Sequence, residues 1–132
     1  MSTALVPIDP KTLELIHSSF GKEGRLQPFA REIMLIECHI AGTGYANVKE
    51  IEPDLLADAI LVLKRETDNP HDPLAIVICD EKGRKLGYVP RVKNEALARL
   101  MDAGKLIFAR LLSKEWHADW LRVEARVFLR DL

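Results

Sequence analysis

The amino-acid sequence predicts a mainly β protein of the α+β class, in which about six short strands form a curled antiparallel sheet or small barrel with one or two helices. Apolar segments of strand length recur between turn-forming residues, without the strand–helix–strand alternation of a parallel sheet. In addition, 132 residues with 48% hydrophobic and 30% charged residues are typical of one globular domain. We divide the chain into an N-terminal helical extension, residues 1–32, and a barrel domain, residues 33–132.

The N-terminal extension is expected to contain a short amphipathic helix. Asp9 and Pro10 match an N-cap followed by a proline in the first helical position. Leu13, Ile16 and Phe20 then recur at helical spacing, and glycines follow directly. We therefore expect the helix to end before the first strand begins.

Two strands are expected in the first half of the barrel domain. The first covers residues 32–41, although its apolar and polar residues alternate imperfectly, and the Gly-Thr-Gly run at residues 42–44 ends it. Residues 52–56 resemble a short helical or turn segment, and the second strand follows over residues 59–65.

The strongest turn signal in the chain lies at residues 66–73, which contain two prolines and three Asp or Asn residues. These residue types favour turns capped by their own side chains, so strand pairing must stop there. The next two strands, residues 75–80 and 85–89, flank a short glycine-containing loop and therefore predict a β-hairpin.

The C-terminal part predicts one helix and a second pair of strands. After Pro90, apolar residues at helical spacing indicate an amphipathic helix of about ten residues, which residues 102–104 close. Residues 106–112 and 120–129 follow, and the latter alternate apolar and polar side chains over a long run. We expect an antiparallel pair whose last strand closes the barrel.

The net charge of −1 and the isoelectric point near 6.4 exclude a global positive field, so any nucleic-acid site must be local. One local feature, the basic cluster, contains no acidic residue; its members are Lys82, Arg84, Lys85, Arg91 and Lys93. The cluster can form a phosphate-binding patch. It can equally be the solvated face of an edge hairpin that its charges protect from aggregation. The composition leaves both interpretations open.

Compartment and redox state follow from three further observations. No apolar run approaches the roughly 20 residues that span a bilayer, and the first residues lack the pattern of a signal peptide. We therefore expect a cytoplasmic protein with no membrane partner. Cys38 and Cys79 lie inside apolar strand segments, which favours buried thiols over a disulfide.

Two sequence blocks resemble the signature of HIRAN domains. Residues 65–76 read R-E-T-D-N-P-H-D-P-L-A-I, which is similar to the family string R-E-x-x-N-P-x-D-x-x-A-hydrophobic. Residues 85–91 read K-L-G-Y-V-P-R, which resembles the family's G-Y-[VL]-P-R turn, and a helix ending in glycine follows. A weaker match lies at residues 41–45, and the resemblance as a whole covers residues 33–129.

The resemblance implies a modified OB-like or SH3-like barrel. It also implies binding of single-stranded DNA at its free 3′-hydroxyl end, in repair or in the processing of stalled forks. The family occurs fused to Swi/Snf-type translocases and as free-standing bacterial proteins. This chain resembles the free-standing kind because it has no G-x-x-x-x-G-K-[ST] phosphate loop. The implied partners are DNA and a helicase or other repair protein in trans.

The resemblance also implies a pocket for the 3′ end, with DNA-binding residues Tyr45, Asn69, His71, Asp72, Tyr88, Arg91, Lys93, Trp116 and Trp120. The carboxylate of Asp72 can accept a hydrogen bond from a 3′-hydroxyl and would repel a 3′-phosphate. The amide of Asn69 offers a donor and an acceptor. Aromatic side chains can stack on bases, and the basic cluster would meet phosphates.

The sequence also departs from the members that grip DNA. Gly44, Tyr45 and Ala46 stand where those members carry an arginine before a pair of tyrosines, so one phosphate contact and one stacking platform are absent. His71 occupies a position that is commonly tyrosine, and its ring can still stack on a base.

Each candidate also has a purely structural interpretation. The carboxylate and amide of the 66–73 turn can simply cap backbone amides, and Tyr88 can be a half-buried strand aromatic. Trp116 and Trp120 can be buried in the barrel mouth.

Two other function classes remain as alternatives. One is a metal-dependent phosphodiester hydrolase whose ligands would be Glu66, Asp68, His71, Asp72 and Asp80. No zinc-type spacing supports it, so we expect no catalytic residue, metal or cofactor. The other is a protein-interaction adaptor that binds an acidic tail or a C-terminal carboxylate in the same groove.

Overall fold

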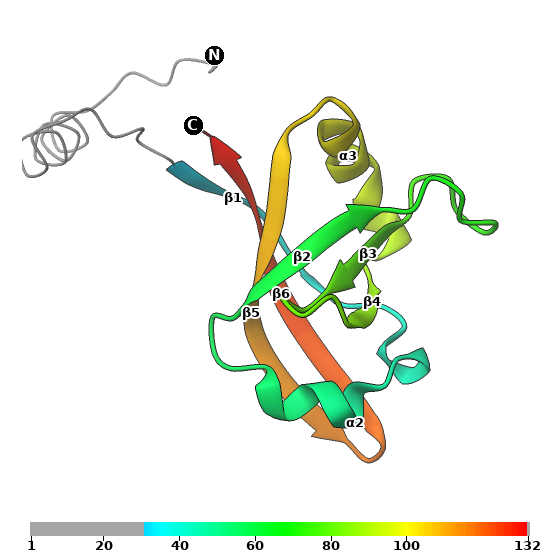
Figure 1. The fold of residues 1–132 in the computed structure, drawn as a ribbon, viewed down its shortest axis with the longest axis vertical. Helices are drawn as coiled ribbons and strands as arrows, with labels where there is room; N and C mark the ends of the chain where they lie inside the picture. The colour runs from blue at the N-terminus through cyan, green and yellow to red at the C-terminus, as the bar shows by residue number, and fades with distance from the viewer. Residues whose placement is uncertain (1–30, 132) are drawn as a thin grey trace, which may run out of the picture.

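The computed structural model describes residues 31–131, which form a six-stranded antiparallel sheet in the order β1-β6-β5-β2-β3-β4 (Figure 1). The strands are β1 (Arg31–His39), β2 (Ile60–Arg65), β3 (Ile76–Cys79), β4 (Lys85–Tyr88), β5 (Leu106–His117) and β6 (Trp120–Asp131). The helices are α2 (Val48–Ile51) and α3 (Arg91–Asp102), with short 3₁₀ turns η1 (Thr43–Tyr45) and η2 (Glu52–Asp54). The mainly β class with about six strands is confirmed.

The sheet curls until its two edge strands meet. Ala41, just after β1, exchanges two backbone hydrogen bonds of 2.8 Å with Tyr88 of β4. The two strands approach so closely that a Cβ atom on Gly87 would lie 2.3 Å from the carbonyl oxygen of Ala41. Glycine is therefore required at this position, and the sheet is joined into a barrel at this one bridge.

The core lies inside the curl and follows the alternation that the sequence shows. Leu121, Val123, Ala125 and Val127 of β6 all point inward and are buried. Helices α2 and α3 lie at opposite ends of the sheet in Figure 1. Each contributes buried apolar residues, such as Ile51 and Leu97, to the same core.

Both cysteines are buried and free, as the sequence predicts. Burial raises the pKa of each thiol above its ordinary value, because a thiolate is poorly solvated there. No helix within residues 31–131 is long and apolar enough to cross a membrane.

The predicted boundaries differ from the structure most clearly at β5. This strand continues to His117, well past the predicted end at residue 112. The register against β6 shifts between Leu111 and Ser113, which is the signature of a β-bulge. The shift breaks the period-two pattern, and for this reason the sequence suggested an early end. The helix expected near Asp9 lies outside the described residues.

Candidate nucleic-acid interface

The turn between β2 and β3 is shaped by two of its own side chains. The Oδ1 atom of Asn69 accepts hydrogen bonds from the backbone N–H groups of His71 (2.8 Å) and Asp72 (3.0 Å). The Oδ1 atom of Asp72 accepts one from the N–H of Leu74 at 2.9 Å. The capping that the turn composition predicts is therefore present, and it uses the acceptor that Asn69 would otherwise offer to a ligand.

Arg65 ties the base of this turn to α3. Its guanidinium donates hydrogen bonds to the carbonyl oxygens of Pro73 (3.0 Å) and Ala75 (2.8 Å). It also pairs with the carboxylate of Asp102 at 2.9 Å. Sequence reasoning matched Arg65 to the family string but assigned it no role. Only the fold shows that it joins three segments.

A second network fixes Tyr88 beside the turn. The Oε1 atom of Glu66 accepts hydrogen bonds from the Asn69 amide (2.9 Å) and from the Tyr88 hydroxyl (2.8 Å). These two donors, the Asn69 amide first, hold the pKa of Glu66 below its ordinary value. The Tyr88 oxygen in turn accepts a hydrogen bond from Lys85 Nζ at 2.8 Å.

Tyr45 is displayed by the short turn η1. Gly42 precedes this turn in the left-handed conformation, with φ 78°, and its carbonyl accepts a hydrogen bond from the N–H of Tyr45. The buried hydroxyl of Thr43 donates a 2.7 Å hydrogen bond to the carbonyl of Leu121 on β6. The turn is thus anchored to the barrel while the Tyr45 side chain is 97% exposed.

These segments enclose a groove of about 330 Å³. Its lining residues are Ala41, Gly42, Tyr45, Asn69, His71, Asp72, Ala75, Tyr88, Val89 and Arg91. The first-strand turn, the 66–73 turn and the start of α3 therefore meet around one concave surface. Of the DNA-binding candidates, it unites Tyr45, Asn69, His71, Asp72, Tyr88 and Arg91.

Asp72 is the anionic group of this groove. Its Oδ2 atom accepts a hydrogen bond from the Asn94 amide at 2.8 Å and lies 3.8 Å from Arg91 Nε. The N–H of Leu74, then Asn94 and Arg91, hold the pKa of Asp72 below its ordinary value, so the carboxylate is ionised at neutral pH. Its lone pairs are not exhausted by these contacts, and a further donor can bind.

Asn94 is a supporting residue to which sequence reasoning gave no role. It is 3% exposed, although it is polar, and it lies on the same face of α3 as the buried Leu97. A polar residue within the apolar stripe of a helix was the signal that could have pointed to it. The structure shows that its buried amide is satisfied by Asp72.

Three candidates lie away from the groove. Lys93 Nζ donates to the backbone carbonyl of Glu37 on β1 at 3.0 Å. Trp116 and Trp120 lie at the end of the β5–β6 hairpin, 39% and 40% exposed, and neither lines the groove. The tryptophans were grouped with the pocket as possible stacking aromatics, but the length of β5 carries them to another part of the barrel.

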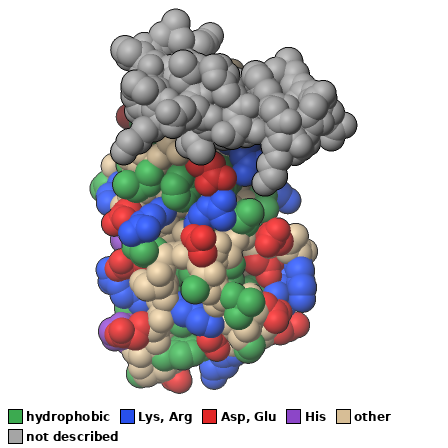
Figure 2. All heavy atoms as spheres, turned by 90° about the vertical axis from the view of Figure 1, so that its left-hand side faces the viewer, with side chains coloured by type: hydrophobic (Ala, Val, Ile, Leu, Met, Phe, Trp, Pro, Cys, Tyr) green, Lys and Arg blue, Asp and Glu red, His purple; other side chains and the backbone are tan. Residues whose placement is uncertain are grey.

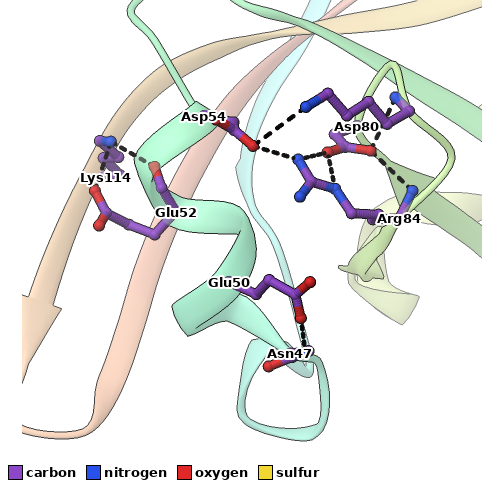
Figure 3. Close-up of polar contacts among 8 residues, drawn as sticks. Asn47, Glu50, Glu52, Asp54, Asp80, Arg84 and Lys114 are labelled. Atoms are coloured by element: carbon purple, nitrogen blue, oxygen red, sulfur yellow. Dashed lines mark hydrogen bonds and ion pairs between the residues drawn. The ribbon is translucent and has the colours of Figure 1, made fainter.

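The basic cluster does not form one patch. Arg84 is held between Asp54 and Asp80, at 2.8 and 2.7 Å (Figure 3). Lys82 also lies 3.5 Å from Asp54. On the face that lies to the left in Figure 1, Figure 2 shows acidic and basic side chains interspersed. Local ion pairing therefore neutralises much of the charge that the sequence pattern suggested.

The ligand set of the hydrolase alternative does not assemble. Within residues 31–131, no three His, Cys, Asp or Glu side chains gather as they would around a metal ion. Asp80 instead caps the β3–β4 loop, where it accepts hydrogen bonds from the backbone of Lys82 and Arg84.

Comparison with known proteins places the fold. The family model described as the HIRAN domain matches residues 33–130. A protein from Lactobacillus plantarum superimposes with a TM-score of 0.73 at 22% identity, over 79% of this chain and 100% of that chain. The human HLTF HIRAN domain matches at 19% identity in its crystal structure and 17% in its NMR structure, with TM-scores of 0.59 and 0.52. Both cover 75% of this chain and 78% of that chain. No curated protein sequence matches the chain.

Proposed function

The chain belongs to the HIRAN domain family, and we propose that it is a non-enzymatic module that binds single-stranded DNA at its free 3′-hydroxyl end. The observation that carries this proposal is the single groove shared by Tyr45, Asp72 and Arg91, which come from three separate segments. By analogy with the translocase-fused family members, we place this activity in repair or stalled-fork processing, with a helicase or other repair protein acting in trans.

The groove offers the contacts that a terminal nucleotide requires. The ring of Tyr45 is open to solvent, and a base stacked on an aromatic side chain gains roughly 1–3 kcal/mol. Arg91, at the start of α3, lines the same groove and can meet a phosphate. His71 lines the same groove and supplies a second ring.

The ionised Asp72 supports recognition of the end rather than of the middle of a strand. A free 3′-hydroxyl can donate a hydrogen bond to its carboxylate, whereas a phosphate at that position brings a second negative charge. Asn69 has a different role in this proposal. Because its oxygen accepts two backbone N–H groups, it shapes the turn that presents Asp72 and His71.

The test compares three forms of one oligonucleotide by fluorescence anisotropy: a 3′-hydroxyl, a 3′-phosphate and a circular strand. We expect the 3′-hydroxyl form to bind about tenfold or more tightly than the others. Asp72→Asn should abolish this preference, because the amide oxygen can still accept the Leu74 N–H but the charge is gone. Asp68→Asn, in the same turn but outside the groove lining, is the matched control. Equal binding of the three forms by the wild type would refute end recognition.

The non-enzymatic part of the proposal has its own test. Labelled single and double strands incubated with the protein and magnesium or manganese should stay intact. Cleavage that disappears in Asp72→Asn would establish the hydrolase alternative instead.

The adaptor alternative keeps one specific observation in its favour. The basic cluster is dispersed, and Arg91 is the cationic side chain that lines the groove. A peptide carboxylate can pair with this guanidinium as a phosphate can. A peptide with a free C-terminus that competes with the oligonucleotide, while its amidated form does not, would favour this function.

A further inference from the structure

A second hollow adjoins the groove at Tyr45. It has a volume of about 370 Å³, and its lining includes Tyr45, Asn47, Glu50, Arg84 and Lys85. Tyr45 lines both spaces and is 97% exposed, so both faces of its ring are open to solvent. A strand bound in the groove would find a second stacking surface on the far side of this ring.

Lys85 lies where the two spaces meet. It lines the second hollow, while its Nζ atom donates a 2.8 Å hydrogen bond to the hydroxyl of Tyr88, which lines the groove. The same atom lies 4.4 Å from the centroid of the Tyr88 ring. The contact with Tyr88 uses one of the three N–H donors of the ammonium group, and the others are available to an anion.

Lys85 keeps donors available to an anion, whereas Arg84, the other cation of the second hollow, is paired with carboxylates. Arg84 is held by the carboxylates of Asp54 and Asp80 (Figure 3). Among the ion pairs of residues 31–131, by contrast, Lys85 has no carboxylate partner within 4.0 Å. Hydrogen bonding to Tyr88 also raises the pKa of Lys85, which keeps it charged.

We propose that the DNA strand continues from the groove past Tyr45 into the second hollow, with its last internucleotide phosphate bound by Lys85. The penultimate base then stacks on the second face of Tyr45, and the ligand unit is two nucleotides rather than one. This inference rests on the proposed function and adds the direction in which the strand leaves the groove.

The experiment neutralises one phosphate at a time. The ligand is an oligothymidine of about ten nucleotides with a 3′-hydroxyl, within the roughly 4–16 nucleotides that OB-type barrels cover. One derivative carries an uncharged methylphosphonate at the last internucleotide linkage, and a second carries it at the 5′-most linkage. Fluorescence anisotropy measures the dissociation constants.

We expect the methylphosphonate at the last linkage to weaken wild-type binding about tenfold, because it removes a charge-assisted contact. The same group at the 5′ linkage should have no effect. Lys85→Gln should bind the unmodified strand about tenfold more weakly and should no longer distinguish it from the last-linkage derivative. Lys85→Arg should restore the distinction, and Lys105→Gln, an exposed lysine that lines neither space, should resemble the wild type.

The outcomes separate the two proposals. If the wild type prefers a 3′-hydroxyl but the last-linkage derivative binds as well as the unmodified strand, end recognition stands and this path is overturned. If Lys85→Gln loses affinity equally for both ligands, the lysine does not meet that phosphate, and the path is again overturned. If no strand binds at all, both proposals fall together.

Discussion

Polar side chains of the 66–73 turn act mainly on the protein itself. Asn69 and Asp72 cap backbone amides, Glu66 joins Asn69 to Tyr88, and Arg65 closes the base of the turn. A family string that looks like a list of ligand-binding residues is therefore largely a description of how one loop holds its shape. Asn69 and Asp72 both line the groove, and of the two Asp72 keeps lone pairs to spare.

The role of Arg65 leads to a prediction about stability. Arg65→Met should lower the free energy of unfolding by about 2 kcal/mol, because two backbone carbonyls lose a charged donor. Asp102→Asn removes only the partly exposed ion-pair partner and should cost clearly less. Urea denaturation measures both. Equal losses would mean that the carbonyl contacts contribute nothing.

The network at Glu66 leads to a prediction about pH. Its pKa lies below the ordinary value of 4.5 in the folded state, so its contribution to stability is present above about pH 4.5 and is lost as the pH falls through the depressed pKa. Asp72 and Asp80 shift in the same direction. The free energy of unfolding should therefore decline in acid.

Glu66→Gln should flatten part of this decline, since its amide cannot be protonated in that range and still offers an acceptor to Tyr88. Glu81→Gln, in the exposed loop between β3 and β4, should leave the profile unchanged. Urea denaturation between about pH 6 and pH 3 distinguishes the variants. A wild-type profile that stays flat into acid would contradict this account.

Among the elements, the bridge between β1 and β4 decides where the groove lies. It brings the η1 turn, which carries Tyr45, next to β4 and to the turn that follows β2. The groove exists because two segments far apart in the chain are joined at the seam of the curled sheet.

The close approach of β1 and β4 at the Ala41–Tyr88 bridge can be tested by substituting Gly87. Gly87→Ala should destabilise the protein by about 2 kcal/mol or more, because the added methyl group meets a backbone oxygen that cannot move aside. Gly44→Ala, in the neighbouring turn, has nothing within 4 Å of the added atom and should be tolerated. Thermal unfolding compares them. If the two variants unfold alike, the close approach of β1 and β4 is not a constraint in solution.

At the scale of the whole molecule, the net charge is −1 and ion pairs use much of the available positive charge. Long-range attraction to DNA is therefore small, so the proposed function requires that affinity come from a few contacts inside the groove and beside it. This distinguishes the protein from strand-coating proteins, whose grooves are uniformly basic.

The dependence of affinity on salt concentration measures how many phosphates the protein contacts. With about two phosphate contacts, at Arg91 and Lys85, the plot of log affinity against log salt should have a shallow slope of about −1.4, from roughly −0.7 per phosphate on a single strand. Anisotropy titrations between low and moderate salt give the slope. A flat plot would show that the protein binds no phosphate. A slope steeper than about −3 would show that it binds more phosphates than Arg91 and Lys85 can contact.

The sequence by itself determined the order and type of the elements, because strand alternation, helix periodicity and turn chemistry are local properties. The alternation of β6, the β3–β4 hairpin, α3 and the 66–73 turn were all predicted. Through the HIRAN resemblance it also named six of the residues that line the groove, together with three, Lys93, Trp116 and Trp120, that do not. It misplaced the end of β5, where a bulge breaks the local period.

Only the tertiary structure decided which charges remain available. Arg84 is neutralised by Asp54, which lies thirty positions earlier in the chain, whereas Lys85 next to it is turned toward Tyr88. Lys93 reaches β1, and the tryptophans are carried to the end of a long hairpin. The partners of these side chains depend on how the curled sheet brings distant segments of the chain together. A local pattern of residues does not determine which distant segments meet where β1 and β4 join.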